Sequence, residues 1–147
     1  MIDELDRKIV RAMNRNARRS FREIAKDVGS SATAVINAVK KLEAAGAVTG
    51  YVPVVDPAYF GLHLAAIVAV RISQGKLLET QQKIADDPHV TAVYDVTGEW
   101  DSFIIGYFTD REDLNGFIKK VTSLPHVDRT VTHLVLNVIK EDKRLPV

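Results

Sequence analysis

The sequence predicts an α+β protein with a helical N-terminal domain and a mixed α/β C-terminal domain, and three observations support this. Apolar residues recur at helical spacing through residues 1–50. Strand-like and helix-like segments then follow in the order βαββαβ. The motifs DPHV at 87–90 and LPHV at 124–127 lie 37 residues apart, and each follows a predicted helix and precedes a predicted strand.

Three helices are expected in the N-terminal domain. Ile2, Leu5, Ile9 and Met13 share one face of the first helix. Ser20 and Glu23 form a capping-box pattern that begins the second, which ends at Gly29. The third runs from an N-cap at Ser31 to a C-terminal glycine at 46.

The spacing of Ala25, Gly29 and Val35 favours a helix-turn-helix motif. Two helices that cross steeply after a tight turn need a small residue at their contact and a glycine in the turn. They also need an apolar anchor on the second helix. A three-helix bundle without DNA-binding activity is the alternative that this pattern leaves open.

The third helix has a small, polar outer face. Thr33, Asn37 and Lys40 stack on the side opposite Val35, with Lys41 beside them. Thr and Asn can form hydrogen bonds with base edges, and Lys can reach phosphates.

The two parts of the chain differ in charge. Residues 1–50 hold ten Lys/Arg and six Asp/Glu (+4), whereas residues 51–147 hold ten Lys/Arg and thirteen Asp/Glu (−3). Duplex DNA is therefore the expected partner of the first domain, although a solvated helix face is the simpler alternative.

The C-terminal domain is expected to be ferredoxin-like, with a four-stranded antiparallel sheet and both helices on one face. Its strands at 64–73 and 102–109 are apolar on both sides, which predicts at least a homodimer. The expected domain bounds are 1–46, a strand or hairpin connection at 47–63, and 64–147. We expect strands at 64–73, 90–97, 102–109 and 127–140, and helices at 76–86 and 110–123.

The turn GEWD at 98–101 is a candidate small-molecule site. Gly98 permits close backbone approach, Asp101 can accept hydrogen bonds from an ammonium group, and Trp100 can shield a pocket. Thr130 and Thr132 share one face of the last strand and can add hydroxyls. The alternative is an ordinary hairpin turn with an exposed aromatic residue.

Composition makes other classes of protein improbable. The chain has no cysteine and four scattered histidines, so neither a disulfide framework nor a metal site is expected. The first residues do not resemble a signal peptide, and the longest apolar run, 64–70, is too short to span a bilayer. We expect a cytoplasmic protein without a cofactor or a membrane partner.

Taken together, these motifs resemble the Lrp/AsnC (feast/famine) family over essentially the whole chain. The resemblance rests on LDRKIV, IAKDVGSS, VKKLEAAGAV, GYVPVVDPAYFG, GEWD and PHVDRTVTHLVL. It implies a transcriptional regulator with a helix-turn-helix head and an amino-acid-sensing (RAM, ACT-like) domain, whose dimers often assemble into octamers. It also implies that the Gly-x-x-Asp turn and nearby threonines bind the effector between dimers, which adds Glu99 to the candidates.

The candidate residues form two sets. The DNA-binding set is Arg18, Arg19, Ser20, Arg22, Ser30, Ser31, Thr33, Asn37, Lys40 and Lys41. The effector set is Gly98, Glu99, Trp100, Asp101, Thr130 and Thr132.

One departure from the family concerns the recognition helix. Family members commonly have arginine in its middle, where this chain has Ile36, Asn37 and Ala38. This departure leaves open a metabolite-binding module without a DNA role. Resemblance to sirohaem decarboxylases of the same architecture leaves open an enzyme, although no clustered set of basic and histidine residues is evident.

Overall fold

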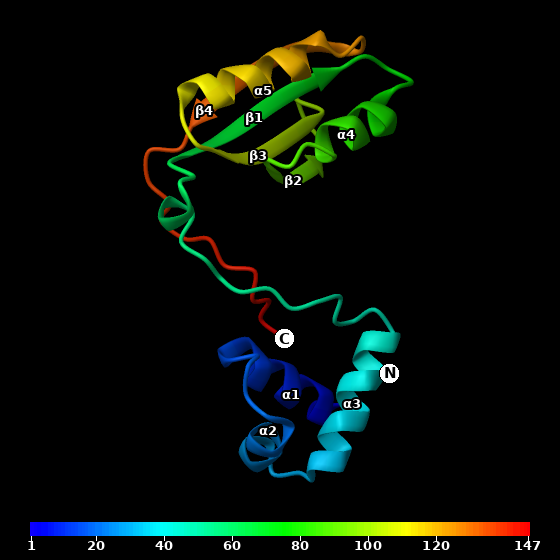
Figure 1. Ribbon diagram of the computed structural model, residues 1–147. Helices are drawn as coiled ribbons and strands as arrows, with labels where there is room; N and C mark the ends of the chain where they lie inside the picture. The colour runs from blue at the N-terminus through cyan, green and yellow to red at the C-terminus, as the bar shows by residue number, and fades with distance from the viewer. The chain divides into compact units, whose positions relative to one another are not determined.

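The computed structural model describes residues 1–147 and divides the chain into two compact units (Figure 1). The first unit, here called the head, comprises Met1–Val54 and Glu141–Val147. The second, here called the sensing unit, comprises Val55–Lys140. No helix combines the length and hydropathy needed to cross a membrane.

The head contains three helices, and the expected capping box of Ser20 and Glu23 is present at the start of the second. Asp3 and Asp6 form a further capping box at the start of the first helix, which the sequence analysis did not identify. These boxes satisfy amides that lack partners within the helix. The helices are α1 (Glu4–Arg15), α2 (Phe21–Val28) and α3 (Ala32–Ala44).

The predicted helix-turn-helix spacing has its expected physical basis. Ala25 is 4% exposed and Val35 is fully buried, and both belong to the same core cluster between the helices. Gly29 ends α2 with φ +69°, a left-handed conformation that residues with a Cβ rarely adopt. The head is therefore a helix-turn-helix domain.

The C-terminal tail belongs to the head by its contacts. The Arg11 Nε donates to the Val147 backbone oxygen at 2.6 Å, and the Asn14 side-chain amide donates to the Leu145 oxygen at 3.4 Å. The chain thus enters the sensing unit after Val54 and returns to the head at Glu141.

The sensing unit is a four-stranded antiparallel sheet with strand order β2-β3-β1-β4. This order places the first and third strands at the centre, as the ferredoxin-like prediction requires. The elements are η1 (Ala58–Phe60), β1 (Leu64–Ile72), α4 (Leu77–Ala85), β2 (Val90–Asp95), β3 (Ser102–Phe108), α5 (Arg111–Ser123) and β4 (Val127–Leu134).

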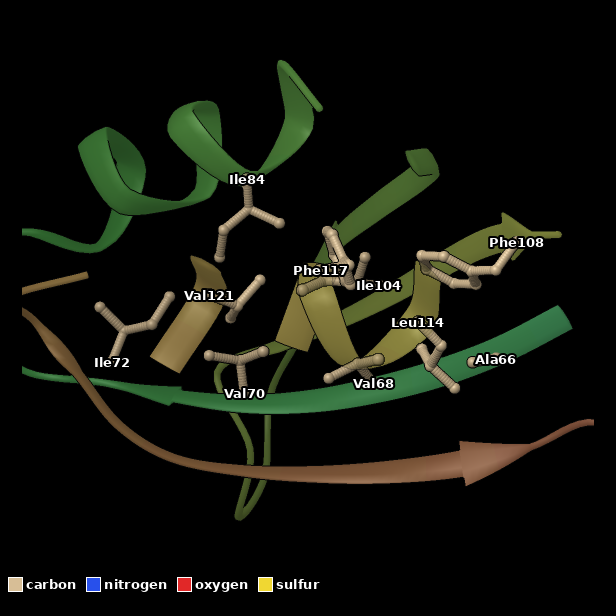
Figure 2. Packing of buried hydrophobic residues seen from close by; sticks show 10 residues of the cluster. All are labelled: Ala66, Val68, Val70, Ile72, Ile84, Ile104, Phe108, Leu114, Phe117 and Val121. Atoms are coloured by element: carbon tan, nitrogen blue, oxygen red, sulfur yellow. The ribbon is translucent and has the colours of Figure 1, made fainter. Parts of the chain in front are cut away.

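Both helices cover the same face of this sheet. Figure 2 shows Ile84 of α4 and Val121 of α5 directed toward Val68 and Val70 of β1. The buried cluster consists of Ala66, Val68, Val70, Ile72, Ile84, Ile104, Phe108, Leu114, Phe117 and Val121. The opposite face of the sheet has no helix over it within the sensing unit.

Two expected strands differ from the structure. The last strand ends at Leu134 rather than at 140, because the Val135 amide makes the final bond to β1, at the Ala65 oxygen. Residues 47–56 have no regular secondary structure, so the expected strand or hairpin is absent. A hydrophobic pattern alone does not form a strand, since a strand needs a neighbour to satisfy its backbone.

Gly106 of β3 occupies a position with no room for a side chain. An added Cβ would lie 2.8 Å from the Phe108 ring and 3.2 Å from the His89 backbone oxygen. We expect Gly106→Ala to lower the free energy of unfolding by about 1–3 kcal/mol, because the Phe108 ring must move within a packed core.

The matched control is Gly116→Ala in α5, where an added Cβ meets nothing within 4 Å. That change is expected to be neutral or to stabilise by up to about 1 kcal/mol, since Ala has the higher helix propensity. Urea unfolding followed by circular dichroism measures both, and equal effects would contradict this packing argument.

Candidate nucleic-acid interface and effector site

Helix α3 presents the expected polar residues on its exposed side. Thr33, Asn37 and Lys40 are exposed, whereas Val35 and Val39 on the opposite side are buried. The Ser31 hydroxyl accepts the Ala34 amide at 3.1 Å and so begins the helix. Ser31 therefore positions the helix, and the three exposed residues are free for base and phosphate contacts.

Lys41 has a structural partner that the sequence analysis did not identify. Its Nζ lies 2.6 Å from the Asp6 Oδ2 and 3.9 Å from the Asp3 Oδ2. Asp6 is fully buried, and its Oδ1 has no hydrogen-bond partner, so Lys41 supplies the main compensation for this carboxylate. Lys41 joins α3 to α1, which makes it a poorer candidate for phosphate binding than Lys40.

The Asp6–Lys41 contact also shifts the titration of both groups. The hydrogen bond from Lys41, together with the Asp3 amide, lowers the pKa of Asp6. The same hydrogen bond raises the pKa of Lys41. Both groups therefore stay charged over a wider pH range than free side chains do.

The other DNA-binding candidates near α2 are of two kinds: residues whose side chains are used in contacts within the head, and arginines whose side chains make no ion pair. The Arg19 Nη1 lies 2.6 Å from the Asp27 Oδ2, and this hydrogen bond lowers the pKa of Asp27. Ser20 is used by the capping box, and Ser30 is half-buried in the turn. Arg18 and Arg22 are exposed, and neither side chain makes an ion pair, so they are the available cations of this group.

Tyr51 closes a small pocket in the head that sequence reasoning missed. Its hydroxyl donates to the Glu43 Oε1 at 2.9 Å, and burial together with this bond raises the pKa of Tyr51 to about 12. The pocket has a volume of about 250 Å³. Its lining residues are Met13, Ala17, Arg19, Ser20, Phe21, Glu43 and Tyr51. The contact fixes the start of the connecting segment against α3.

The turn before β3 is built around Asp101. The Ile72 amide donates to the Asp101 Oδ2 at 2.7 Å, and the Asp101 amide donates to the Val70 oxygen at 3.1 Å. Gly98 has φ +114°, which only glycine adopts readily. Asp101 thus holds the turn to β1, a role in addition to the ligand contact that the sequence suggested.

The remaining effector candidates do not all meet within one chain. Trp100 is half-buried and lies under the Arg129 guanidinium, 5.0 Å from ring centroid to Cζ. Thr130 and Thr132 pair with Val70 and Val68, so they lie on the face that the helices cover. Arg129, one residue before Thr130, points to the other face. Glu99 is exposed in the turn.

Two family models match the chain. The AsnC-type helix-turn-helix domain matches residues 2–43, and the Lrp/AsnC ligand binding domain matches residues 65–145. An uncharacterized HTH-type transcriptional regulator of Pyrococcus abyssi is 42% identical over 145 residues, which is 99% of each chain. An HTH-type transcriptional regulator of Methanocaldococcus jannaschii is 35% identical over 148 residues and all of both chains.

Solved structures agree with these matches. A transcriptional regulator of Neisseria meningitidis in complex with L-Met superposes with a TM-score of 0.91 at 28% identity, covering 99% of this chain and 97% of that one. AsnC of E. coli superposes with a TM-score of 0.87 at 28% identity, covering 96% of each chain. The similarity therefore extends over both domains.

The Asp6–Lys41 pair predicts a pH-dependent contribution to the stability of the head. Because the folded pKa of Asp6 is lowered, this contribution is complete above the range in which unfolded aspartate titrates, about pH 4. It is lost as the pH falls through the folded pKa. We expect Lys41→Met to lower the melting temperature by a few degrees at neutral pH and to weaken the acid-side dependence.

The control is Lys40→Met, the neighbouring exposed lysine without an ion pair. Thermal melts followed by circular dichroism across the acid range measure both variants. Indistinguishable melting curves for the two would show that the Asp6–Lys41 pair contributes nothing.

Proposed function

Because the chain belongs to the Lrp/AsnC family of helix-turn-helix transcriptional regulators, we propose that α3 reads an operator in duplex DNA and that an amino acid or related metabolite controls this binding. The observation that carries the proposal is the exposed face of α3 formed by Thr33, Asn37 and Lys40. Acting on DNA, the protein would work in the cytoplasm.

The charge of the head supports DNA as the partner. Lys40, Arg18 and Arg22 are exposed cations without ion pairs, whereas Lys41 and Arg19 are held by Asp6 and Asp27. Asn37 can bond an adenine edge, while Lys40 contacts phosphate. In this proposal, arginine at the edge of the motif replaces arginine within the recognition helix.

We propose that the face of the sheet opposite α4 and α5, here called the open face, pairs with a second copy of the chain. Ile67 of β1 lies beside Ile105 of β3, and Ala69 lies beside Phe103, so apolar side chains cover its centre. These residues are only half-buried or covered by their neighbours in a single chain. A two-fold axis would cover such a face with an identical one and set two heads on one base. Dimers would then assemble further, up to octamers.

A dimer compensates for the modest contacts of one head. Two linked heads can engage half-sites about 34–36 Å apart, and linkage raises the effective concentration of the second head. Affinity then depends on how the heads are spaced.

The effector is proposed to bind at the Gly98–Asp101 turn. The similar Neisseria meningitidis regulator forms a complex with L-Met, which supports an amino acid as the effector class. Thr130 and Thr132 lie on the opposite sheet face from Arg129, so a neighbouring subunit is needed to bring both groups around one ligand. A ligand that binds one assembly better than another shifts the population toward it and changes the spacing of the heads.

We expect Asn37→Ala to reduce sequence preference, because it removes a base contact, with up to about 1–3 kcal/mol less discrimination against mismatched sites. Lys40→Ala is expected to weaken binding to all sequences equally and to reduce the slope of log affinity against log salt by about 1. Mobility shifts with the gene's own upstream region, at several salt concentrations, measure both.

Lys119→Ala is the control, since this exposed lysine lies on α5 in the sensing unit. A salt-independent affinity of the unmodified protein, or no DNA binding at low salt, would refute the DNA role.

The homodimer predicts a specific effect at Ile67. Ile67→Glu would bury an unpaired carboxylate in the proposed interface, and we expect the dimer dissociation constant to rise about 100-fold or more. Leu78→Glu is the control, because Leu78 is 74% exposed on α4. Sedimentation velocity over a concentration series measures both, with circular dichroism to verify folding. Dimerisation that survives Ile67→Glu unchanged would exclude this face.

A further inference from the structure

We propose that Arg71 and Arg129 form a carboxylate-binding site on the open face of the sheet, beside the Gly98–Asp101 turn. The inference rests on the proposed function in that it assigns the carboxylate of an amino-acid effector to these two guanidinium groups. Neither arginine belongs to the candidate set that the sequence suggested.

The strand register places two positive charges side by side. Arg71 of β1 is the direct cross-strand partner of Arg129 of β4. Their side chains therefore lie on the same face, opposite the helix-covered face to which Val70 and Thr130 belong. Like charges in directly opposed positions destabilise a sheet. An anion that lies between or above the two groups would offset this repulsion.

No group of this chain supplies that anion. Both arginines are exposed, and neither makes an ion pair. Asp128 precedes Arg129 in the chain and Asp101 is bonded to β1, but neither carboxylate pairs with an arginine. The Asp101 Oδ2 accepts the Ile72 amide at 2.7 Å, and the Asp128 Oδ1 accepts the Ser73 hydroxyl at 2.7 Å.

Trp100 holds one of the two guanidinium groups in place. The Arg129 Cζ lies 5.0 Å from the centroid of the indole ring, which is a favourable cation–π geometry. An arginine restrained in this way loses less rotational freedom when it binds an anion. The register also shifts between Arg71 and Ile72, and such bulges commonly redirect a side chain at a binding site.

The chemistry of the site fits an α-amino acid. A guanidinium fork matches the two oxygens of a carboxylate, and two forks can share one carboxylate. The second oxygen of Asp101 accepts no hydrogen bond in the structure, and Glu99 is exposed in the same turn. These two acids provide negative charge for the ammonium group. The same carboxylate chemistry is also offered by an acidic side chain of a second copy, so the test must separate the two sources.

The test compares Arg71→Gln, Arg129→Gln and Arg129→Lys with the unmodified protein. Each common L-amino acid is titrated singly, using calorimetry and the fluorescence of Trp100, the only tryptophan. The amide derivative of the tightest binder, which lacks the carboxylate charge, is titrated as well. Arg111→Gln on α5 is the matched control, because it removes an exposed arginine of the same unit. Sedimentation of every variant reports on assembly.

We expect each glutamine variant to lose about tenfold or more in amino-acid affinity, since a charge-assisted hydrogen bond is removed. Arg129→Lys should retain part of the affinity, Arg111→Gln should retain all of it, and the amide derivative should bind weakly to every protein. If no amino acid binds but both glutamine variants assemble less than the control, the carboxylate comes from a second copy.

Amino-acid affinity that is equal in the unmodified protein and in both glutamine variants would overturn the carboxylate site. In that case, effector-dependent DNA binding by the unmodified protein would still support the proposed function. Unchanged assembly together with no amino-acid binding would also overturn the site. DNA binding measured on the same samples then decides separately whether the regulator function stands.

Discussion

The sensing unit depends on the two-sided use of β1. Val68 and Val70 point into the core beneath α4 and α5, whereas Ile67 and Ala69 point to the face without helices. Because α4 and α5 both pack on one face, the second apolar face of the sheet has no helix over it. The same alternation places Arg71 on that open face beside Arg129. The core, the proposed dimer interface and the proposed anion site therefore all follow from one strand.

In the head, the corresponding constraint is the attachment of α3 to α1. The buried Asp6 carboxylate receives Lys41, while Val35 and Val39 pack into the core. A buried carboxylate without a counter-ion is unfavourable, so this pair favours one orientation of the recognition helix. The two adjacent lysines therefore have different roles. Lys41 stabilises the fold through Asp6, whereas Lys40 is exposed to solvent.

The turn before β3 contains both residues that attach it to β1 and residues of the proposed effector site. Asp101 uses one oxygen to hold the turn to β1, and its other oxygen accepts no hydrogen bond. Trp100 supports Arg129 rather than lying exposed as an ordinary turn residue would. A ligand at this turn would contact Asp101 and Arg129, whose side chains are already restrained. This restraint reduces the conformational entropy that is lost on binding.

Local patterns in the sequence determined the helix-turn-helix head, the caps of its second helix and the ferredoxin-like order. Helical periodicity, the Ser20–Glu23 pair and Gly29 each act over a few residues. The exposed positions of Thr33, Asn37 and Lys40 followed from the same periodicity. Only the tertiary structure decided which charges are free, since Asp6 and Lys41 are 35 residues apart in the chain. It also decided that Arg71 meets Arg129 and that Thr130 faces away from Arg129. Those relations depend on strand register and on alternation across the sheet, and no short stretch of sequence encodes the pairing of distant strands.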